Sequence, residues 1–409
     1  MRVDQQDSYK TELATTVTGI HATDDGTWVT LQESVFYPTA GGQLHDTGTL
    51  EFNGGTASVV DVSLAKDDPN AAVRHQVESS AELSVGMPVV ARIDWGRRYR
   101  HMQRHSAQHL VSQAFLHVDP RFETHSVSLT SGDVTIDLAG QPSHNHLLEA
   151  LALARQWGYT NLEVKAFEVP DMELAEYALR RPPKVTGMIR LVQMGDVEIA
   201  ACGGTHVAHT AEILPLLAVS TQRIRGDLTR ITFRAGLEAS ELAQAALGQV
   251  DRLAQSFSAS RDDLEARVEQ LRDEEARINY AANQVLEAWA HLLLTQEAST
   301  DDGAVLTKII EAPAGTEASI ALNAVSEVAA TLMPERITLL GAREAGRAML
   351  LFRAGPSCTG TSDVRPALQA ALAILDGRGG GKPERAQGSG SQPAALEEAL
   401  AAARAAISQ

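Results

Sequence analysis

Residues 202–206 read Cys202-Gly203-Gly204-Thr205-His206, and they complete a pattern that begins at His105-Ser106-Ala107-Gln108-His109. The earlier stretch lies in a segment, 97–118, that we predict to be helical. Side chains four residues apart project from one face of a helix, about 6 Å apart. The two glycines let the later stretch curl so that Cys202 and His206 reach one point. Three imidazoles and one thiolate suit Zn²⁺, which prefers tetrahedral nitrogen and sulfur ligands.

The expected cofactor is one zinc ion per chain. Four protein ligands would close a tetrahedral site, whereas three would leave one position for water, and the spacing is compatible with both. His101 precedes His105 by four residues and His209 follows His206 by three, so each is a further candidate ligand or a neighbour of the site. Asp196, shortly before the cysteine, can orient a ligand imidazole or serve as a turn residue. The expected ligands are His105, His109, Cys202 and His206.

The composition is that of a globular protein with two or three domains. The chain has 409 residues, of which 44% are apolar and 21% are charged. Two cysteines cannot build a disulfide framework, so we expect a reducing compartment. No run of about eighteen apolar residues occurs and the N-terminal sequence lacks an apolar signal core, so we expect a cytoplasmic protein.

The net charge of −17 argues against a general nucleic-acid coat, because phosphate neutralisation dominates such binding. Two arginine-rich runs, 92–104 and 223–234, nevertheless border the expected ligands. Each run taken singly could be a solvated face, but together they favour an anionic substrate. Their arginines are Arg92, Arg97, Arg98, Arg100 and Arg104 in the first run, and Arg223, Arg225, Arg230 and Arg234 in the second.

Hydrophobic patterning predicts a mixed α+β fold in four parts. Residues 1–92 alternate apolar and polar positions and form a β-rich subdomain, and 93–236 form an α+β core that carries the ligands. Residues 237–297 repeat apolar positions in the rhythm of a coiled coil or helical hairpin, which also fits a plain amphipathic helix. Residues 298–409 form a small α/β domain. Within the core we expect strands at 133–138, 161–168, 187–194, 196–201 and 229–234, and helices at 145–157 and 170–180.

A glycine-rich segment, 376–390, is the least typical part of the last domain. Its glycines expose backbone N–H groups that can approach a phosphate closely. It is not a Walker loop, because no Gly-Lys-Ser/Thr opens a helix. The alternative is a flexible linker.

Three motifs, in the same order along the chain, resemble one family. Residues 105–109 with 202–206 look like the HxxxH…CGGTH signature of alanyl-tRNA editing domains. Residues 36–48 resemble the glycine-rich motif of the same family, with Ala40 in place of the usual first glycine of a triple. The glycine run with 386–388 is similar to the DHHA1 domain that ends alanyl-tRNA synthetase. The resemblance covers nearly the whole chain and is to the freestanding editing proteins, AlaX, in their long form.

This resemblance implies a hydrolase that deacylates tRNA(Ala) mischarged with serine, and leaves open whether glycine is also removed. A synthetase pocket for alanine rejects serine poorly and cannot exclude glycine, since one methylene gives only about 10–200-fold discrimination. Zinc could lower the pKa of a bound water to about 7, or hold the substrate while a second water attacks. No aminoacylation domain precedes the editing region in this sequence, so we do not expect the chain to charge tRNA.

The hydrolytic site must spare alanine, and serine offers a hydroxyl that alanine lacks. A site that hydrogen-bonds this hydroxyl can discriminate by about 10⁴-fold. The loop after Phe36 supplies the candidates for the catalytic site: Thr39 and Gln43, with the backbone of Gly41 and Gly42 as further substrate contacts.

The other expected contacts are with tRNA. By resemblance, the C-terminal domain and its glycine segment contact a distant part of the tRNA, and the helical arm sets their separation. The arm or the C-terminal domain could also pair two chains as a homodimer. The expected tRNA-binding residues are Arg98, Arg104, Arg223, Arg225, Gly380, Gly381, Lys382 and Gln387.

Two other functions fit parts of the pattern. A phosphoesterase with a DHHA1-type domain needs an Asp-His-His triplet, and the sequence contains none. A non-catalytic, zinc-stabilised tRNA-binding protein would keep the ligands and the basic faces but would need no specificity pocket. Deacylation of seryl-tRNA separates this alternative from the hydrolase.

Overall fold

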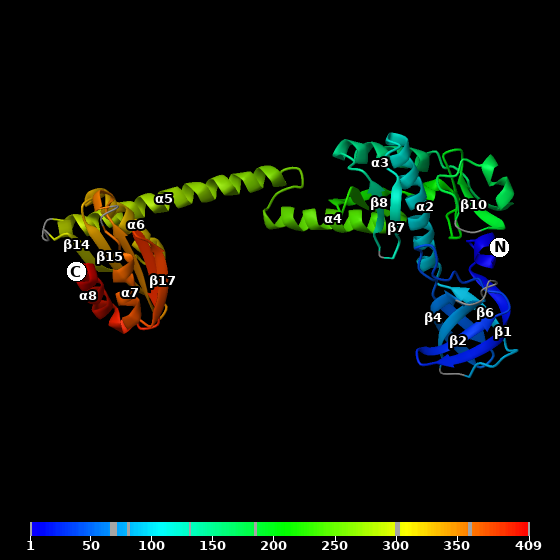
Figure 1. The fold of residues 1–409 in the computed structure, drawn as a ribbon, viewed down its shortest axis with the longest axis horizontal. Helices are drawn as coiled ribbons and strands as arrows, with labels where there is room; N and C mark the ends of the chain where they lie inside the picture. The colour runs from blue at the N-terminus through cyan, green and yellow to red at the C-terminus, as the bar shows by residue number, and fades with distance from the viewer. Residues whose placement is uncertain are drawn as a thin grey trace. The chain divides into compact units, whose positions relative to one another are not determined.

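The computed structural model describes residues 2–65, 72–79, 82–130, 132–183, 186–298, 303–358 and 362–407. The chain divides into two compact units, Met1–Arg252 and Leu253–Gln409. Both units contain helices and sheets, which confirms the mixed α+β fold (Figure 1). Within the described ranges, no helix is both long and apolar enough to cross a membrane.

The first unit begins with a closed antiparallel barrel, in the strand order β1-β2-β5-β4-β3-β6. Valines such as Val29, Val59 and Val62 are fully buried inside it, since alternate residues of each strand face inward. Closure leaves the barrel without free sheet edges. The strands are β1 (Glu12–Thr23), β2 (Gly26–Leu31), β3 (Gly48–Phe52), β4 (Gly55–Leu64), β5 (Val73–Ser79) and β6 (Pro88–Ile93).

The helix α2, Trp95–Val118, follows the barrel and is the central, mostly buried helix of the core (Figure 1). It begins at Asp94, whose carboxylate accepts a hydrogen bond of 3.1 Å from the backbone N–H of Arg97. Met102 and Phe115 anchor the helix in the main hydrophobic cluster. Because most of its length is buried, its polar side chains must find internal partners.

Two antiparallel sheets and the helix α3 surround α2. One sheet has the order β12-β13-β8-β7 and the other the order β11-β10-β9. The short helix α1, Val3–Gln6, precedes the barrel in sequence but contacts this core. The elements are β7 (Thr124–Ser128), β8 (Val134–Ala139), α3 (His144–Tyr159), β9 (Val164–Pro170), β10 (Met188–Met194), β11 (Glu198–Ala201), β12 (Leu216–Arg223) and β13 (Leu228–Ala235).

The helix expected at 170–180 is wrong. Only a 3-10 helix, η1 at Asp171–Glu176, follows β9, and an irregular segment then leads to Pro182. Pro170 before the segment and the proline pair after it restrict the backbone, and the apolar residues Leu174 and Tyr177 pack onto the sheet instead.

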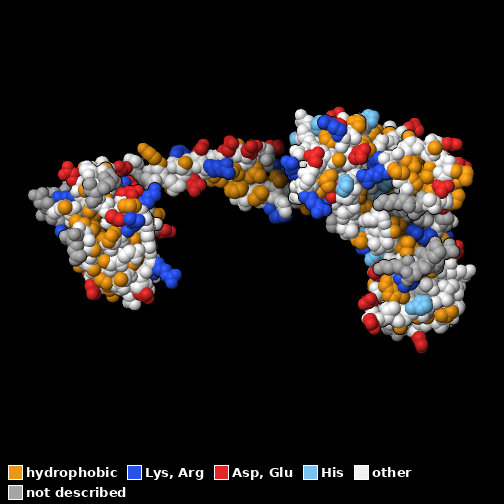
Figure 2. Space-filling view, viewed as in Figure 1, with side chains coloured by type: hydrophobic (Ala, Val, Ile, Leu, Met, Phe, Trp, Pro, Cys, Tyr) orange, Lys and Arg blue, Asp and Glu red, His pale blue; other side chains and the backbone are white. Residues whose placement is uncertain are grey.

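The segment expected to form a helical arm consists of two helices. They are α4, Gly236–Ser256, and α5, Leu264–Ala298. Ile278, Val285 and Leu292 of α5 are seven residues apart and are 61%, 68% and 74% exposed. Figure 2 shows hydrophobic side chains on the surface of this helix. These three apolar side chains are therefore uncovered on α5 within the described residues, and the coiled coil stays a prediction.

The second unit is built on a five-stranded sheet of order β14-β15-β16-β18-β17. One hydrophobic cluster joins the sheet to α7 and α8, and another joins it to α6 and the end of α5. β14 pairs with β15 in parallel, and the other pairs are antiparallel. The elements are β14 (Val305–Ile310), α6 (Ala318–Leu332), β15 (Ile337–Glu344), β16 (Arg347–Ala354), α7 (Arg365–Ile374), β17 (Gly377–Lys382), β18 (Arg385–Gly390) and α8 (Leu396–Ile407).

The glycine-rich segment is an ordered β-hairpin of β17 and β18, so its interpretation as a flexible linker is wrong. Backbone hydrogen bonds to β18 fix β17 although none of its six residues has an apolar side chain. β17 is the edge strand, and the outward N–H groups of an edge strand are not paired within the sheet. The hairpin can therefore still present backbone donors to a ligand.

Candidate metal centre

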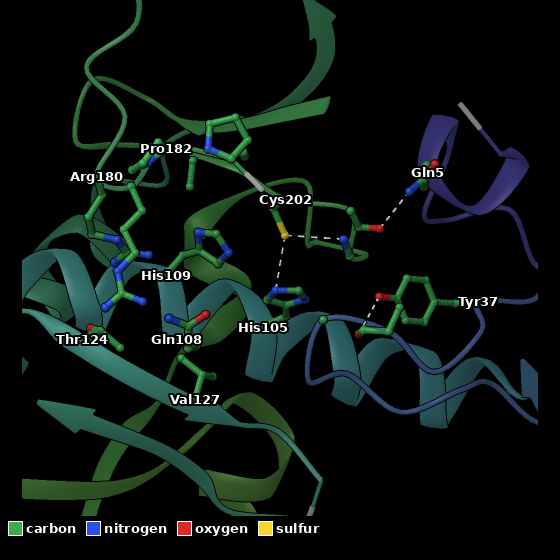
Figure 3. A pocket seen from close by; sticks show the side chains of 18 of the residues that line it. Gln5, Tyr37, His105, Gln108, His109, Thr124, Val127, Arg180, Pro182 and Cys202 are labelled. Carbon is green, nitrogen blue, oxygen red and sulfur yellow. Dashed lines mark hydrogen bonds between the residues drawn. The ribbon is translucent and has the colours of Figure 1, made fainter. Parts of the chain in front are cut away.

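The two motifs meet in the core of the first unit. His105 and His109 project from α2, and Cys202 and His206 come from the loop after β11. One donor atom from each of the four lies within 4.8 Å of all the others. Cys202 Sγ is 3.4 Å from His105 Nε2 (Figure 3). It is 3.2 Å from His206 Nε2. This donor set could hold a metal ion.

The second nitrogen of each histidine has its own partner. His105 Nδ1 donates to Gln43 Oε1 at 2.8 Å, and His109 Nδ1 donates to Glu198 Oε1 at 3.2 Å. His206 Nδ1 lies 3.1 Å from Ser106 Oγ. A histidine whose Nδ1 carries the proton has a free lone pair on Nε2, so these three contacts aim Nε2 at the centre of the cluster.

Gln43 is fully buried and connects the glycine-rich loop to the cluster. Its Nε2 donates to Thr205 Oγ1 at 2.8 Å, while its Oε1 also accepts from the backbone N–H of Thr205 at 3.3 Å. Gly41 and Gly42 have φ angles of +58° and +85°, which turn the loop so that this side chain points inward. Ala40 needs no positive φ, which explains why alanine is tolerated there.

The loop that carries Cys202 packs closely against His105 and is hydrogen-bonded to Arg190. A Cβ on Gly204 would lie 2.1 Å from His105 Cε1, so only glycine fits at that position. Arg190 Nη1 donates to the carbonyl oxygens of Cys202 at 2.7 Å and Gly204 at 3.0 Å. Arg190 Nη2 donates to the carbonyl oxygen of Gln5, which joins α1 to the same loop.

The electrostatic environment favours the metal-binding forms of three of the four ligands. Burial lowers the pKa of His105 to about 4 and holds the pKa of His206 well below its ordinary value, so both are neutral. Burial alone would raise the pKa of the Cys202 thiol, but a hydrogen bond from His109 and the charge of Arg190 outweigh it and lower that pKa. Burial opposes protonation of His109, but its hydrogen bonds to Cys202 and Glu198 outweigh burial and raise its pKa, so His109 must give up a proton when it binds a metal ion. The thiolate of Cys202 and the neutral imidazoles of His105 and His206 are already in the forms that bind metal ions.

A cavity of about 470 Å³ opens beside the cluster. Figure 3 shows Tyr37 on one side of the histidines, and Thr124 and Arg180 on the other. Thr124 Oγ1 and Arg180 Nη1 are buried and have no hydrogen-bond partner. Buried donors without partners are rare, and two that line one cavity mark where a polar ligand would bind. Val127 is an apolar residue of the same lining (Figure 3).

Three family models match the chain. Residues 189–232 match the threonyl and alanyl tRNA synthetase second additional domain, and residues 10–97 match the tRNA synthetases class II (A). Residues 302–409 match the DHHA1 domain. The first match spans five of the cavity residues and two of the ligands, Cys202 and His206.

Curated relatives cover most of the chain. The alanine–tRNA ligase of Hyperthermus butylicus is 29% identical over 93% of this chain and 41% of its own length. The alanine–tRNA ligase of Acidothermus cellulolyticus is 29% identical over 92% of this chain and 43% of its own length. The chain is an AlaX-like protein related to the editing and C-terminal domains of alanyl-tRNA synthetase. The resemblance predicted from the motifs is thus confirmed.

The AlaX-like chain spans about two fifths of the length of the curated relatives it matches. Among solved structures, the C-Ala domain of Aquifex aeolicus alanyl-tRNA synthetase matches with a TM-score of 0.24 and 17% identity. That match covers 26% of this chain and 94% of the other.

Several expected site residues of the AlaX-like chain lie elsewhere. Thr39 is exposed and does not line the cavity, and its Oγ1 contacts His45 Nδ1 at 3.0 Å. Asp196 lies in the turn between β10 and β11, which agrees with its alternative interpretation as a turn residue. The carboxylate that holds a ligand is Glu198, two residues later. His101 and His209 are not members of the cluster.

The expectation that Arg98 and Arg104 bind tRNA is corrected by their burial. Arg98 is 0% exposed, and its Nη2 donates to Asp46 Oδ2 at 2.5 Å. Arg104 is 9% exposed, and its Nε donates to Glu238 Oε2 at 2.7 Å. Each guanidinium is committed to an internal carboxylate, because an unpaired buried charge is very costly. The other expected tRNA-binding residues are exposed: Arg223, Arg225, Gly380, Gly381, Lys382 and Gln387.

Sequence reasoning missed Glu198, Ser106 and Thr124. Glu198 could have been found, because the alternation of a strand places it on the same face as Ala200 and Cys202. Ser106 lies inside the first motif, but its contact with His206 Nδ1 depends on the approach of the distant loop. Nothing in the sequence distinguishes Thr124 from other threonines, because the feature that singles it out is a buried hydroxyl without a hydrogen-bond partner in the folded chain.

Proposed function

We propose that this chain is a hydrolase that removes serine from mischarged tRNA(Ala), with zinc as its cofactor. The proposal is carried by one observation: a buried cluster of three histidines and a cysteine opens into a cavity that holds an unpartnered hydroxyl, on Thr124. The relatives are alanine–tRNA ligases, so the function is related to alanyl-tRNA.

The four side chains fit zinc. In a tetrahedral site with Zn–S of about 2.3 Å and Zn–N of about 2.0 Å, sulfur and nitrogen are about 3.5 Å apart. The separations of Cys202 Sγ from His105 Nε2 and His206 Nε2 are 3.4 Å and 3.2 Å. When bound, zinc supplies a Lewis acid that polarises an ester carbonyl or acidifies a water. Whether three or four of these side chains remain ligands during hydrolysis decides between those two roles.

The chain's own residues prepare the site for the ester. Gln43, Ser106 and Glu198 fix the ring orientations, because each contacts the Nδ1 of one ligand histidine. Arg180 is held by Glu198 at 3.3 Å and keeps Nη1 free of protein partners. This nitrogen is a donor suited to the carbonyl oxygen of the ester, on which negative charge grows during attack by water.

Thr124 supplies the selectivity in this proposal. Its hydroxyl lacks a partner in the protein, and the serine side chain would provide one. Alanine offers only a methyl group, so its ester would leave the buried hydroxyl unpaired, which costs about 1–3 kcal/mol. Glycine would also leave it unpaired, so we propose serine as the principal amino acid removed.

The rest of the tRNA would contact exposed basic and glycine-rich surfaces. Arg223 is the last residue of β12 and Arg225 follows the strand, and both side chains are exposed. In the second unit, Gly380 and Gln387 of the β17–β18 hairpin line two cavities of about 450 Å³ and 780 Å³, one of which also includes Lys382. These surfaces can meet phosphates with cations and free backbone donors.

We also propose that a second copy of the chain covers the apolar seam of α5. Ile278, Val285 and Leu292 repeat at the heptad spacing, and Leu264 and Leu271 continue the same row towards the start of the helix. A row of this length is costly to expose and pairs well with its own copy.

The test is deacylation of Ser-tRNA(Ala), Gly-tRNA(Ala) and Ala-tRNA(Ala) by the zinc-loaded chain. We expect rapid loss of serine, slower loss of glycine and retention of alanine. Tight binding of all three without turnover would instead identify a non-catalytic tRNA-binding protein. Equal loss of serine and alanine would refute the selectivity of Thr124 while leaving hydrolysis in place.

A further inference from the structure

A second polar cavity lies beside α2, outside the metal centre. Its volume is about 430 Å³, and its lining includes Leu44, Arg97, Arg100, His101 and Arg104. None of these residues is a metal ligand, and none lines the cavity of the metal centre. Three arginines in the lining make this cavity suited to an anionic ligand.

His101 supplies a buried hydrogen-bond donor to this cavity. It is 3% exposed, and its Nε2 has no hydrogen-bond partner. Its Nδ1 lies 3.4 Å from Arg104 Nη1, which can only donate, so Nδ1 must accept and the ring proton resides on Nε2. The burial and the neighbouring arginines lower the pKa of His101 to about 3, which keeps the ring neutral. The cavity thus contains a buried N–H donor that needs an oxygen acceptor.

Arg97 supplies the charge. Arg100 pairs with Glu241 and Arg104 pairs with Glu238, so their charges are balanced. Arg97 donates from Nε to the carbonyl oxygen of His45 at 2.9 Å, and within the described residues no carboxylate pairs with it. The lining also contains Asp94, whose carboxylate accepts from the backbone N–H of Arg97 at the start of α2. The Arg97 guanidinium and the N–H donor of His101 are the groups of the cavity that suit an oxyanion such as a phosphodiester.

The second cavity lies close to the metal centre, which indicates that the phosphodiester belongs to the RNA chain whose ester binds there. Gly41 and Val127 line the metal cavity, while Leu44 and Thr130, three residues further along each segment, line the second cavity. On α2, His101 precedes the ligand His105 by one helical turn, about 6 Å along the axis. That separation is on the scale of adjacent nucleotides in an RNA chain.

We propose that the cavity of Arg97 and His101 binds a backbone phosphate of tRNA, close to the 3′ nucleotide whose ester lies at the metal centre. This inference rests on the proposed function, because it takes the ester as the fixed end of the RNA. It also accounts for the buried N–H of His101, for which the folded chain alone provides no acceptor.

The experiment compares two substrates with two variants. Seryl-tRNA(Ala) carries the phosphates, and 3′-seryl-adenosine carries the same ester without them. We expect Arg97→Ala to lower kcat/KM about tenfold for seryl-tRNA, with a markedly smaller change for seryl-adenosine. The slope of log Kd for tRNA(Ala) against log salt should also decrease by about one, since one phosphate contact is lost.

His101→Met gives a second, independent readout. Removing an unpaired buried donor should leave the thermal midpoint of the free protein unchanged or raised, while tRNA affinity falls. Arg92→Ala is the matched control, because Arg92 belongs to the same arginine run but is paired with Glu12 and Glu51 on the barrel. It should leave both substrates unaffected.

The outcomes separate this inference from the proposed function. If the wild-type chain hydrolyses seryl-adenosine and both variants keep the wild-type tRNA affinity and salt slope, the phosphate site is refuted. If His101→Met lowers the thermal midpoint without changing tRNA affinity, His101 is a structural residue and the inference is again wrong. Failure of the wild type to hydrolyse either ester refutes the proposed function instead.

Discussion

Gln43 and His105 are joined by a hydrogen bond of 2.8 Å, although they lie 62 residues apart in sequence. The bond ties the glycine-rich loop to the helix of the metal centre. It also uses the amide oxygen of Gln43, whose nitrogen is already occupied by Thr205. Gln43 is therefore placed to position a ligand, and its amide is not available to sense a substrate.

Gln43→Leu should weaken zinc binding. The apolar side chain cannot accept from His105 Nδ1, and loss of such a partner typically lowers metal affinity by about 10–100-fold. Competition with a chromophoric chelator measures the change. Thr39→Val is the control on the same loop, since Thr39 contacts no ligand histidine, and it should keep the wild-type affinity. Equal affinities for the two variants would show that Gln43 does not hold the ligand.

Cys202→Ala should lose bound zinc and all turnover, because the thiolate is the only sulfur donor of the cluster. Metal analysis per chain after gel filtration provides the measurement. The matched control is Cys358→Ala, which removes the other cysteine, in the second unit, and should retain a full complement of zinc. Zinc retained at the wild-type level by Cys202→Ala would remove this thiol from the ligand set.

Thr124→Val should abolish the preference for serine. Valine has the same shape but no hydroxyl, so the stabilisation of the serine side chain is lost and kcat/KM for Ser-tRNA(Ala) should fall about 10–100-fold. Zinc content should not change. Thr39→Val tests the residue expected from the sequence, and its activity should equal that of the wild type. The reverse result, with only Thr39→Val impaired, would place the sensor on the loop.

The barrel should lose stability in mild acid because of His75. Burial lowers the pKa of His75 to about 4 in the folded barrel, where Nδ1 donates to the carbonyl oxygen of Val29 and Nε2 contacts Ser34 Oγ. The unfolded chain has an ordinary histidine pKa of about 6.5, so it binds the extra proton between these values. The free energy of unfolding therefore falls as the pH falls from 6.5 towards 4.

His75→Gln isolates this contribution. Between pH 7 and pH 5, the wild type should lose about 2 kcal/mol more stability than the variant, since one pKa unit corresponds to about 1.4 kcal/mol. Urea unfolding at the two pH values, with zinc present throughout, gives the difference. Identical pH dependence in the two proteins would mean that His75 is protonated without unfolding.

The apolar row on α5 predicts a dimer. Sedimentation equilibrium should give twice the mass of one chain, and the double variant Ile278→Glu with Val285→Glu should give the mass of one. Leu247→Glu, an exposed change on α4, is the control and should not alter the mass. A monomeric wild type at micromolar concentration would leave the seam without a second copy as its partner.

The parts that the sequence predicts well are those set by local spacing. The histidine pair on a helix and the Cys-Gly-Gly-Thr-His bend each place two donor atoms close together within five residues. The fold then has only to bring these two segments into contact. The barrel and core strands follow from period-two alternation in the same way. The segment at 170–180 fails because its apolar residues cover a sheet rather than one face of a helix.

The parts that escaped prediction depend on distant partners. Arg98 has the sequence context of a surface arginine, yet it is buried because its guanidinium pairs with Asp46, which lies 52 residues away in sequence. Arg104 is likewise hidden by Glu238, which belongs to a different helix. A charged residue and its buried counter-ion are recognised only after folding, since neither residue alone differs from a solvated one.

The helix α1 extends the metal centre to the beginning of the chain. Gln5 Nε2 donates to the carbonyl oxygen of Gly203 at 3.0 Å, and Arg190 reaches back to the carbonyl oxygen of Gln5. A fusion partner or a proteolytic cut that disturbs these first few residues would therefore loosen the bend that holds the sulfur donor. Affinity tags for metal measurements on this protein belong at the opposite terminus.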